Sequence, residues 1–92
     1  MTRESSVEDY LTAQVEKAGG EVRKVKWIGR HSAPDRLVLL KGKHPLVELK
    51  ATGKKPNDAQ FREHERLVKA GFVVWVIDSK AGVDRLVKWA CE

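Results

Sequence analysis

PDRLVLLKGKHPLVELK, residues 34–50, combines two strand-like runs with a short turn between them. The runs at 36–41 and 46–51 are rich in Leu and Val, and the residues that join them, 42–45, are Gly, Lys, His and Pro. This pattern is typical of a hairpin. So short a connection predicts antiparallel strands, because parallel strands need a crossover of a dozen or more residues.

The residues that could carry chemistry lie at the open end of this predicted hairpin. Asp35 precedes Gly42 by seven residues and Lys50 follows it by eight, so both are expected at the end remote from the turn. Side chains alternate along a strand, so Glu48 and Lys50 share one face while Leu49 points to the other. The sequence therefore predicts that two carboxylates and an ammonium group converge there.

Two carboxylates this close repel each other unless a cation lies between them. Hard oxygen ligands suit Mg²⁺ or Mn²⁺, and the backbone carbonyl of Leu49 could add a further ligand. Lys50 would contact the attacking water or a phosphate as charge builds up. The constellation predicts metal-assisted phosphodiester hydrolysis by Asp35, Glu48 and Lys50. Taken singly, a Glu–Lys pair on a strand is usually solvated and an Asp after Pro usually forms a turn, so only their joint placement indicates a site.

The chain before the hairpin is expected to form a helix and a strand. Apolar residues at helical spacing predict a helix from about residue 5 to 18. Ser5 and Glu8 form a capping-box pattern at its start, and Gly19-Gly20 ends it. Residues 21–28 are β-branched and charged, which predicts an exposed strand.

The chain after the hairpin predicts a helix, a strand and a last helix. Asn57 caps the first of these helices, which runs to about residue 70, and its inner face is expected to carry Phe61, His64, Leu67 and Val68. Residues 72–78, FVVWVID, are the most apolar strand and are expected to be buried on both faces. The last helix spans about 82–90. The order αβββαβα predicts an α/β fold with a mixed sheet flanked by helices, in which residues 46–78 make a right-handed crossover.

Composition sets broader limits. Ninety-two residues are expected to form one domain, 1–92, and 18 Lys and Arg against 13 Asp and Glu give a net charge of +5, which favours a polyanionic partner. The polar N-terminus and the lack of a long apolar run predict a cytoplasmic protein with no membrane segment. Cys91 has no partner for a disulfide or metal site. The sequence has no glycine-rich phosphate-binding loop, so no nucleotide cofactor is expected.

Residues 29–30 (GR), 34–38 (PDRLV) and 47–50 (VELK) resemble the PD-(D/E)XK nuclease superfamily, and within it the stand-alone type of the VRR-NUC family, the virus-type replication-repair nucleases. The similarity continues through 57–60 (NDAQ), 71–72 (GF) and 76–79 (VIDS), and so covers nearly the whole chain. The resemblance implies a restriction-endonuclease-like αβββαβ core. It also implies activity on branched or structured DNA, with some members being similar to dimeric Holliday-junction resolvases.

The resemblance also implies roles for single residues. Asp35 and Glu48 match the metal-binding acids of the family and Lys50 its catalytic lysine. Glu8 matches an acid that completes the metal site, and Gln60 a glutamine of the active site. Both also stand at the third position of a helix, where they can close a cap instead. The family commonly has glycine where Ser32 stands, so this loop is expected to have a different shape or to offer a hydroxyl to phosphate.

Basic residues flank the expected site and predict contacts with the DNA backbone. The residues expected to bind DNA are Arg30, His31, Ser32, Arg36, Lys54, Lys55 and Arg62. No base-reading motif is present, so recognition by DNA shape is expected. A homodimer would supply the two nicks that a four-way junction requires, with Val25 and Trp27, or Val87 and Trp89, as interface candidates. The alternatives are a flap- or end-acting nuclease that needs a partner, and an inactive DNA-binding module.

Overall fold

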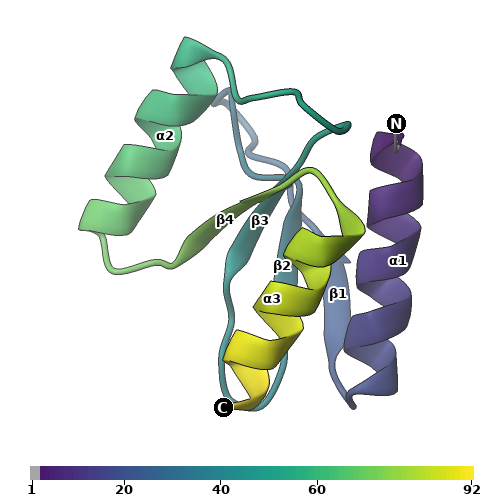
Figure 1. The fold of residues 1–92 in the computed structure, drawn as a ribbon. Helices are drawn as coiled ribbons and strands as arrows, with labels where there is room; N and C mark the ends of the chain where they lie inside the picture. Colours follow the sequence, from purple (N-terminus) through teal and green to yellow (C-terminus); the bar gives the residue numbers. More distant parts are fainter. Residues whose placement is uncertain (1–2) are drawn as a thin grey trace.

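The computed structural model describes residues 3–92, and its elements follow the predicted order (Figure 1). They are α1 (Glu4–Lys17), β1 (Glu21–Lys24), β2 (Arg36–Leu39), β3 (Leu46–Leu49), α2 (Asp58–Lys69), β4 (Val74–Ile77) and α3 (Lys80–Cys91). None of the helices in the described part of the chain has the length and apolar character needed to cross a membrane.

The four strands form one mixed sheet in the order β1-β2-β3-β4. The β2–β3 pair is antiparallel and the β3–β4 pair is parallel, as predicted, and β1 pairs antiparallel with β2. The hairpin turn is tighter than expected, because Leu40 pairs with Lys43 and leaves only Lys41 and Gly42 between the strands. Both have positive φ, 53° and 78°, which matches the twist of the paired strands. His44 and Pro45 therefore belong to the second arm of the hairpin and not to its turn.

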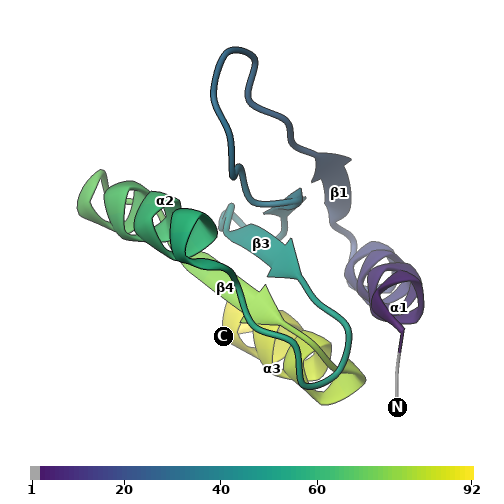
Figure 2. The ribbon, with the colours of Figure 1, turned by 90° about the horizontal axis from the view of Figure 1, so that it is seen from above.

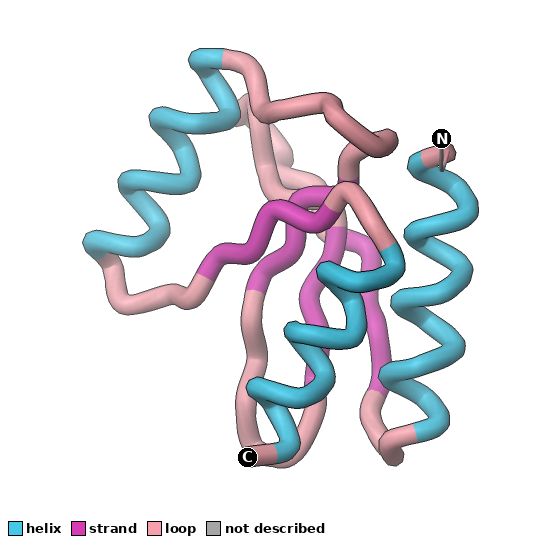
Figure 3. The backbone as a smooth tube through the Cα atoms, viewed as in Figure 1, coloured by secondary structure: helices cyan, strands magenta, loops and turns pink. Residues whose placement is uncertain are grey.

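The helices lie on opposite faces of the sheet. α1 and α3 lie side by side on one face, and α2 lies on the other (Figures 2 and 3). The hydrophobic core is entirely between the sheet and the α1–α3 pair. It comprises Val7, Leu11, Val15, Val38, Leu40, Val47, Leu49, Ile77, Val83, Leu86 and Ala90.

The start of α1 differs from the prediction. The helix begins at Glu4 with Arg3 as its N-cap, and no side chain caps it. Ser5 is therefore inside the first turn, and the expected box of Ser5 with Glu8 is not formed. The side chain of Glu8 forms an ion pair with Arg36 on β2 instead.

The strand β4 is less buried than predicted, because it lies at the edge of the sheet. Ile77 faces the core and is buried, whereas Val76 faces α2 and is 45% exposed. Its run of apolar residues thus has one covered face and one open face.

The buried face of α2 is rotated from the predicted one. Phe61 and Val68, expected inside, are 60% and 56% exposed, whereas His64 is buried as predicted and Glu63 is buried without having been expected inside. The predicted cap is confirmed: Asn57 Oδ1 accepts from the Gln60 backbone N–H, and Gln60 Oε1 accepts from the Asn57 N–H. α2 therefore presents a mainly polar stripe to the sheet.

Candidate active site

The β2–β3 hairpin brings Asp35 and Glu48 together at its open end. Arg36 pairs with Val47, so the next residues outward are Asp35 and Glu48, whose side chains point to the same face. Asp35 Oδ2 accepts a hydrogen bond from the backbone N–H of Leu49 at 2.7 Å. This contact fixes the Asp35 carboxylate beside the third strand.

Glu48 is the centre of the cluster and is only 2% exposed. Its Oε2 lies 3.3 Å from Lys50 Nζ and accepts a 3.3 Å hydrogen bond from Gln60 Nε2. Its Oε1 is buried without a hydrogen-bond partner, and His64 Nε2, also without one, lies 3.7 Å away. One oxygen of Glu48 is therefore held by the side chains around it, and the other is buried without a hydrogen bond.

Gln60 joins the helix cap to the site. Its Oε1 accepts from both the Asn57 backbone N–H and Lys50 Nζ, each at 3.0 Å, while its Nε2 donates to Glu48. The two interpretations of Gln60, as cap and as site residue, are thus compatible in one rotamer. The first turn of α2 consequently positions the lysine on β3.

The surroundings of Glu48 favour its protonated form when no cation is bound. Burial, and then the neighbouring Asp35 carboxylate, raise the pKa of Glu48 to about 7, while Lys50 opposes the shift. Burial, with a smaller effect of Lys50, lowers the pKa of His64. A buried acid beside a second acid gains from any cation that binds both, so the hard oxygen ligands here fit Mg²⁺ or Mn²⁺. Across residues 3–92, no three His, Cys, Asp or Glu side chains are gathered into a complete metal cluster.

Glu8, expected near the metal, is already paired with a cation. Its carboxylate contacts Arg36, whose side chain is 13% exposed and also donates to the backbone carbonyl of Asp35 at 2.9 Å. Arg36 therefore points inward, and its expected contact with DNA stays a prediction. So does the role of Glu8 as a ligand.

The remaining residues expected to bind DNA fall into two places. Lys54 and Lys55 are exposed in the segment between β3 and α2. Arg30, His31, Ser32 and Arg62 line a common pocket of about 330 Å³ between the 29–32 loop and α2.

Two buried residues of α2 that the sequence did not single out as site candidates lie beside the candidate site. His64 faces Glu48, and Glu63, 4% exposed, binds residues far away in sequence, including Trp27 through a 2.7 Å hydrogen bond from its Nε1. Burial alone would raise the pKa of Glu63, but hydrogen bonds from Arg66 and Trp27 and the charge of Arg30 hold it below its ordinary value. The signal in the sequence was a polar stripe at helical spacing, Gln60, Glu63 and His64.

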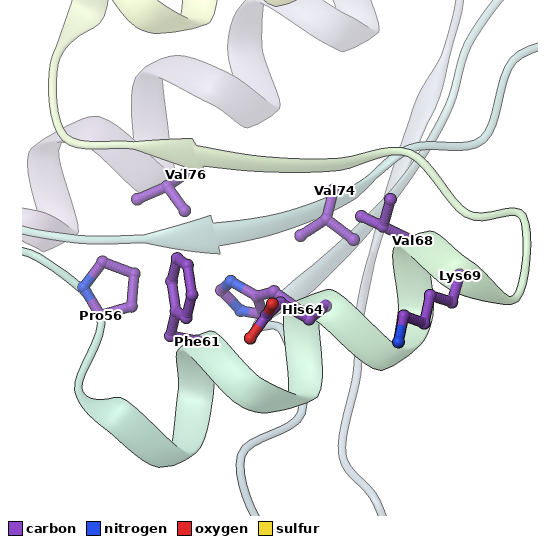
Figure 4. A pocket seen from close by; sticks show the side chains of 8 residues that line it. Pro56, Phe61, His64, Val68, Lys69, Val74 and Val76 are labelled. Carbon is purple, nitrogen blue, oxygen red and sulfur yellow. The ribbon is translucent and has the colours of Figure 1, made fainter.

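An open groove of about 500 Å³ separates α2 from β4 (Figure 4). Phe61 and His64 project into it from the helix, and Val74 and Val76 face them from the strand. The groove is largely apolar and adjoins the site through His64.

Comparison with known proteins points to one group. No protein-family model matches the chain. A protein named "Putative nuclease p44", from Acyrthosiphon pisum secondary endosymbiont phage 1, is 47% identical over 81 residues, which cover 87% of each chain. A solved structure described as a VRR_NUC domain is 42% identical and superimposes with a TM-score of 0.85, covering 96% of this chain and 97% of the other.

Proposed function

Because the chain belongs to the VRR-NUC family of nucleases, we propose that it is a metal-dependent, structure-selective DNA endonuclease that hydrolyses phosphodiester bonds. The observation that carries the proposal is the cluster at the open end of the hairpin. There Lys50 Nζ lies 3.3 Å from the buried Glu48 carboxylate, and Asp35 lies immediately before β2, opposite Glu48.

The residues proposed to hold Mg²⁺ or Mn²⁺ are Asp35, Glu48, the backbone carbonyl of Leu49, and Glu8. The unpartnered Oε1 of Glu48 and its raised pKa support this assignment. When bound, a divalent cation polarises the phosphoryl oxygens and lowers the pKa of a coordinated water. For Glu8 to take part, its carboxylate must leave the Arg36 guanidinium.

Lys50 and Gln60 supply the remaining chemistry. Lys50 is held by Glu48 and by Gln60 Oε1, so its ammonium group needs little reorganisation to stabilise charge developing on the phosphate or to orient the attacking water. Gln60 touches both groups and is a further catalytic residue in this proposal. Its helix cap keeps the amide in place during the reaction.

DNA is proposed to bind across the exposed basic residues beside the cluster. Arg30, His31, Ser32 and Arg62 lie on one side, and Lys54 and Lys55 on the loop before α2. Contacts of this kind are to the backbone, so affinity falls steeply with salt and selectivity comes from DNA shape. The inward-facing Arg36 contributes by holding Glu8 rather than by first contact with the substrate.

A second copy of the chain is proposed to complete the enzyme, as in resolvase-like dimers. Phe61, Val68 and Val76 form an exposed apolar surface along the groove between α2 and the edge strand β4. This surface suits a dimer better than the candidates from the sequence. Trp27 is tied to Glu63, and Trp89 packs on Trp75 with ring centroids 5.6 Å apart.

The test is cleavage of a labelled four-way junction, a flap and a linear duplex of matching sequence, each with Mg²⁺, Mn²⁺ or EDTA. Glu48→Ala controls for contaminating nuclease, and Glu65→Gln, which alters an exposed acid of α2, controls for charge. Metal-dependent nicks confined to the junction are the expected result. Cutting of flaps or ends instead would favour the partner-dependent nuclease, and binding without any cutting would leave only a DNA-binding module.

A further inference from the structure

The pocket between the 29–32 loop and α2 carries an unusual concentration of positive charge. Besides Arg30 and Arg62 it is lined by Arg66, which lies one helical turn further along α2. Its volume is about 330 Å³. Guanidinium groups are planar forks that match phosphate oxygens, so three of them around one hollow fit a phosphate group.

A buried acid behind the pocket fixes two of these arginines. Glu63 Oε1 accepts from Arg30 Nη2 and from Arg66 Nε, both at 2.9 Å. The two arginine side chains are 57% and 55% exposed, so their remaining N–H groups stay open to a ligand. Three guanidiniums against one carboxylate leave two positive charges in excess.

The same acid joins the loop to the helix. Glu63 Oε2 accepts from Trp27 Nε1, which holds the start of the segment that carries Arg30. Arg62, by contrast, makes no ion pair with any residue of 3–92 and is exposed. The pocket thus has two positioned arginines and one free arginine.

We infer that this pocket grips one internal backbone phosphate of the DNA strand being cut, and that Glu63 is a positioning residue that holds Arg30 and Arg66 for it without touching DNA. The inference rests on the proposed function. Arg62 and Arg66 follow Gln60 by two and six residues, about 3 and 9 Å along the helix axis. The gripped phosphate is therefore expected near the scissile one.

Glu63→Gln tests the inference because a positioned pocket and a merely basic surface predict opposite changes in DNA affinity. The change removes a negative charge, so a merely basic surface would bind DNA more tightly. If Glu63 positions the arginines, binding weakens, by about tenfold for loss of an oriented charged contact. Junction affinity is measured in EDTA by fluorescence anisotropy over a range of salt. Glu65→Gln, at an exposed position of the same helix that lines the groove toward β4 and not the basic pocket, removes the same charge and is expected not to weaken binding.

Arg66→Gln keeps the test decisive if Glu63→Gln does not fold, as judged by its circular dichroism and thermal melt. It is expected to weaken binding and to lower the salt slope by about one. A scan with single methylphosphonate linkages then locates the phosphate. One neutral linkage near the cut should weaken the wild type, yet cost Arg66→Gln less, because only Arg30 and Arg62 then remain to contact that phosphate.

Three results would overturn the inference: unchanged or tighter binding by both variants, no sensitive linkage, or an effect that requires a 5′-terminal phosphate. Its failure is separable from that of the proposed function, because binding is measured without metal. If the protein cuts no DNA but one neutral linkage weakens its binding, the nuclease proposal fails and the pocket inference stands. If the wild type cuts junctions and Glu63→Gln binds them with the same affinity, the pocket inference fails and the proposed nuclease function stands.

Discussion

Glu48 combines two properties that rarely occur together in a carboxylate without a bound cation. It is almost completely buried, and one of its oxygens has no partner. Burying a charge costs free energy unless it is compensated, and Lys50 compensates only in part. Ionisation of Glu48 in the metal-free protein therefore costs free energy.

The stability of the metal-free protein should depend on this ionisation. The pKa of Glu48 is about 7 in the folded protein against an ordinary 4.5, so the folded form holds the proton more tightly than the unfolded form. The resulting stabilisation is complete below about pH 4.5 and is lost as the pH rises through 7. With EDTA present, Glu48→Gln should thus exceed the wild type in free energy of unfolding at pH 8, by on the order of 3 kcal/mol at most.

Urea denaturation of both proteins at pH 5 and pH 8 in EDTA measures the effect. Titrating groups remote from Glu48 cancel in the difference, and Glu65→Gln serves as an exposed-acid control. A difference that does not grow between pH 5 and pH 8 would contradict the raised pKa of Glu48.

At the scale of elements, the hairpin and α2 show what could and could not be predicted from the sequence. The hairpin was predictable because alternation along a strand is a local property, which separates Glu48 from Leu49 whatever else the chain does. The face that α2 turns to the sheet was not, because it depends on partners distant in sequence. Trp27, which binds Glu63, is 36 residues away.

The same distinction explains the other differences. The hairpin and cap patterns predicted where Asp35, Glu48, Lys50 and Gln60 lie along the chain, and the structure brings these residues together, while their roles in a reaction stay predictions. The predicted start of α1 was wrong because a side chain in a capping pattern can bind a tertiary partner instead. Here the Glu8 side chain forms an ion pair with Arg36. The apolar run of β4 did not reveal that the strand lies at the edge.

The cap of α2 provides a prediction about the element as a part of the active site. Asn57→Ala removes the acceptor for the Gln60 N–H, which should cost about 1 kcal/mol of stability. Because Gln60 also holds Lys50, nuclease activity should fall several-fold as well. Asn57→Asp keeps an acceptor and should retain both properties.

Ser79→Ala is the matched control, because Ser79 Oγ caps α3 on the opposite face of the sheet. It should lower stability by a similar amount and leave kcat unchanged. Thermal melts and single-turnover cleavage rates of the three variants decide the matter. Equal loss of activity in Asn57→Ala and Ser79→Ala would show that the cap acts only through stability.

At the scale of the whole molecule, the open groove between α2 and β4 determines the proposed assembly. Val68 is 56% exposed in the single chain, so Val68→Glu should fold normally and prevent a second copy from docking. The variant is expected to sediment as a monomer and to make uncoupled single nicks in a junction. Ile28→Glu, at a 98% exposed position outside the groove, should remain a dimer. If the wild type and Val68→Glu sediment with the same mass, this interface is ruled out.

The sheet separates the hydrophobic core, which lies on the side of α1 and α3, from the buried polar cluster on the side of α2. Core side chains point to α1 and α3, and Glu48, Gln60 and His64 lie on the other side. Sequence change on α2 and the neighbouring loop can therefore accumulate without loosening the core. A lineage could exchange one DNA structure for another as its target while its thermal tolerance stays the same.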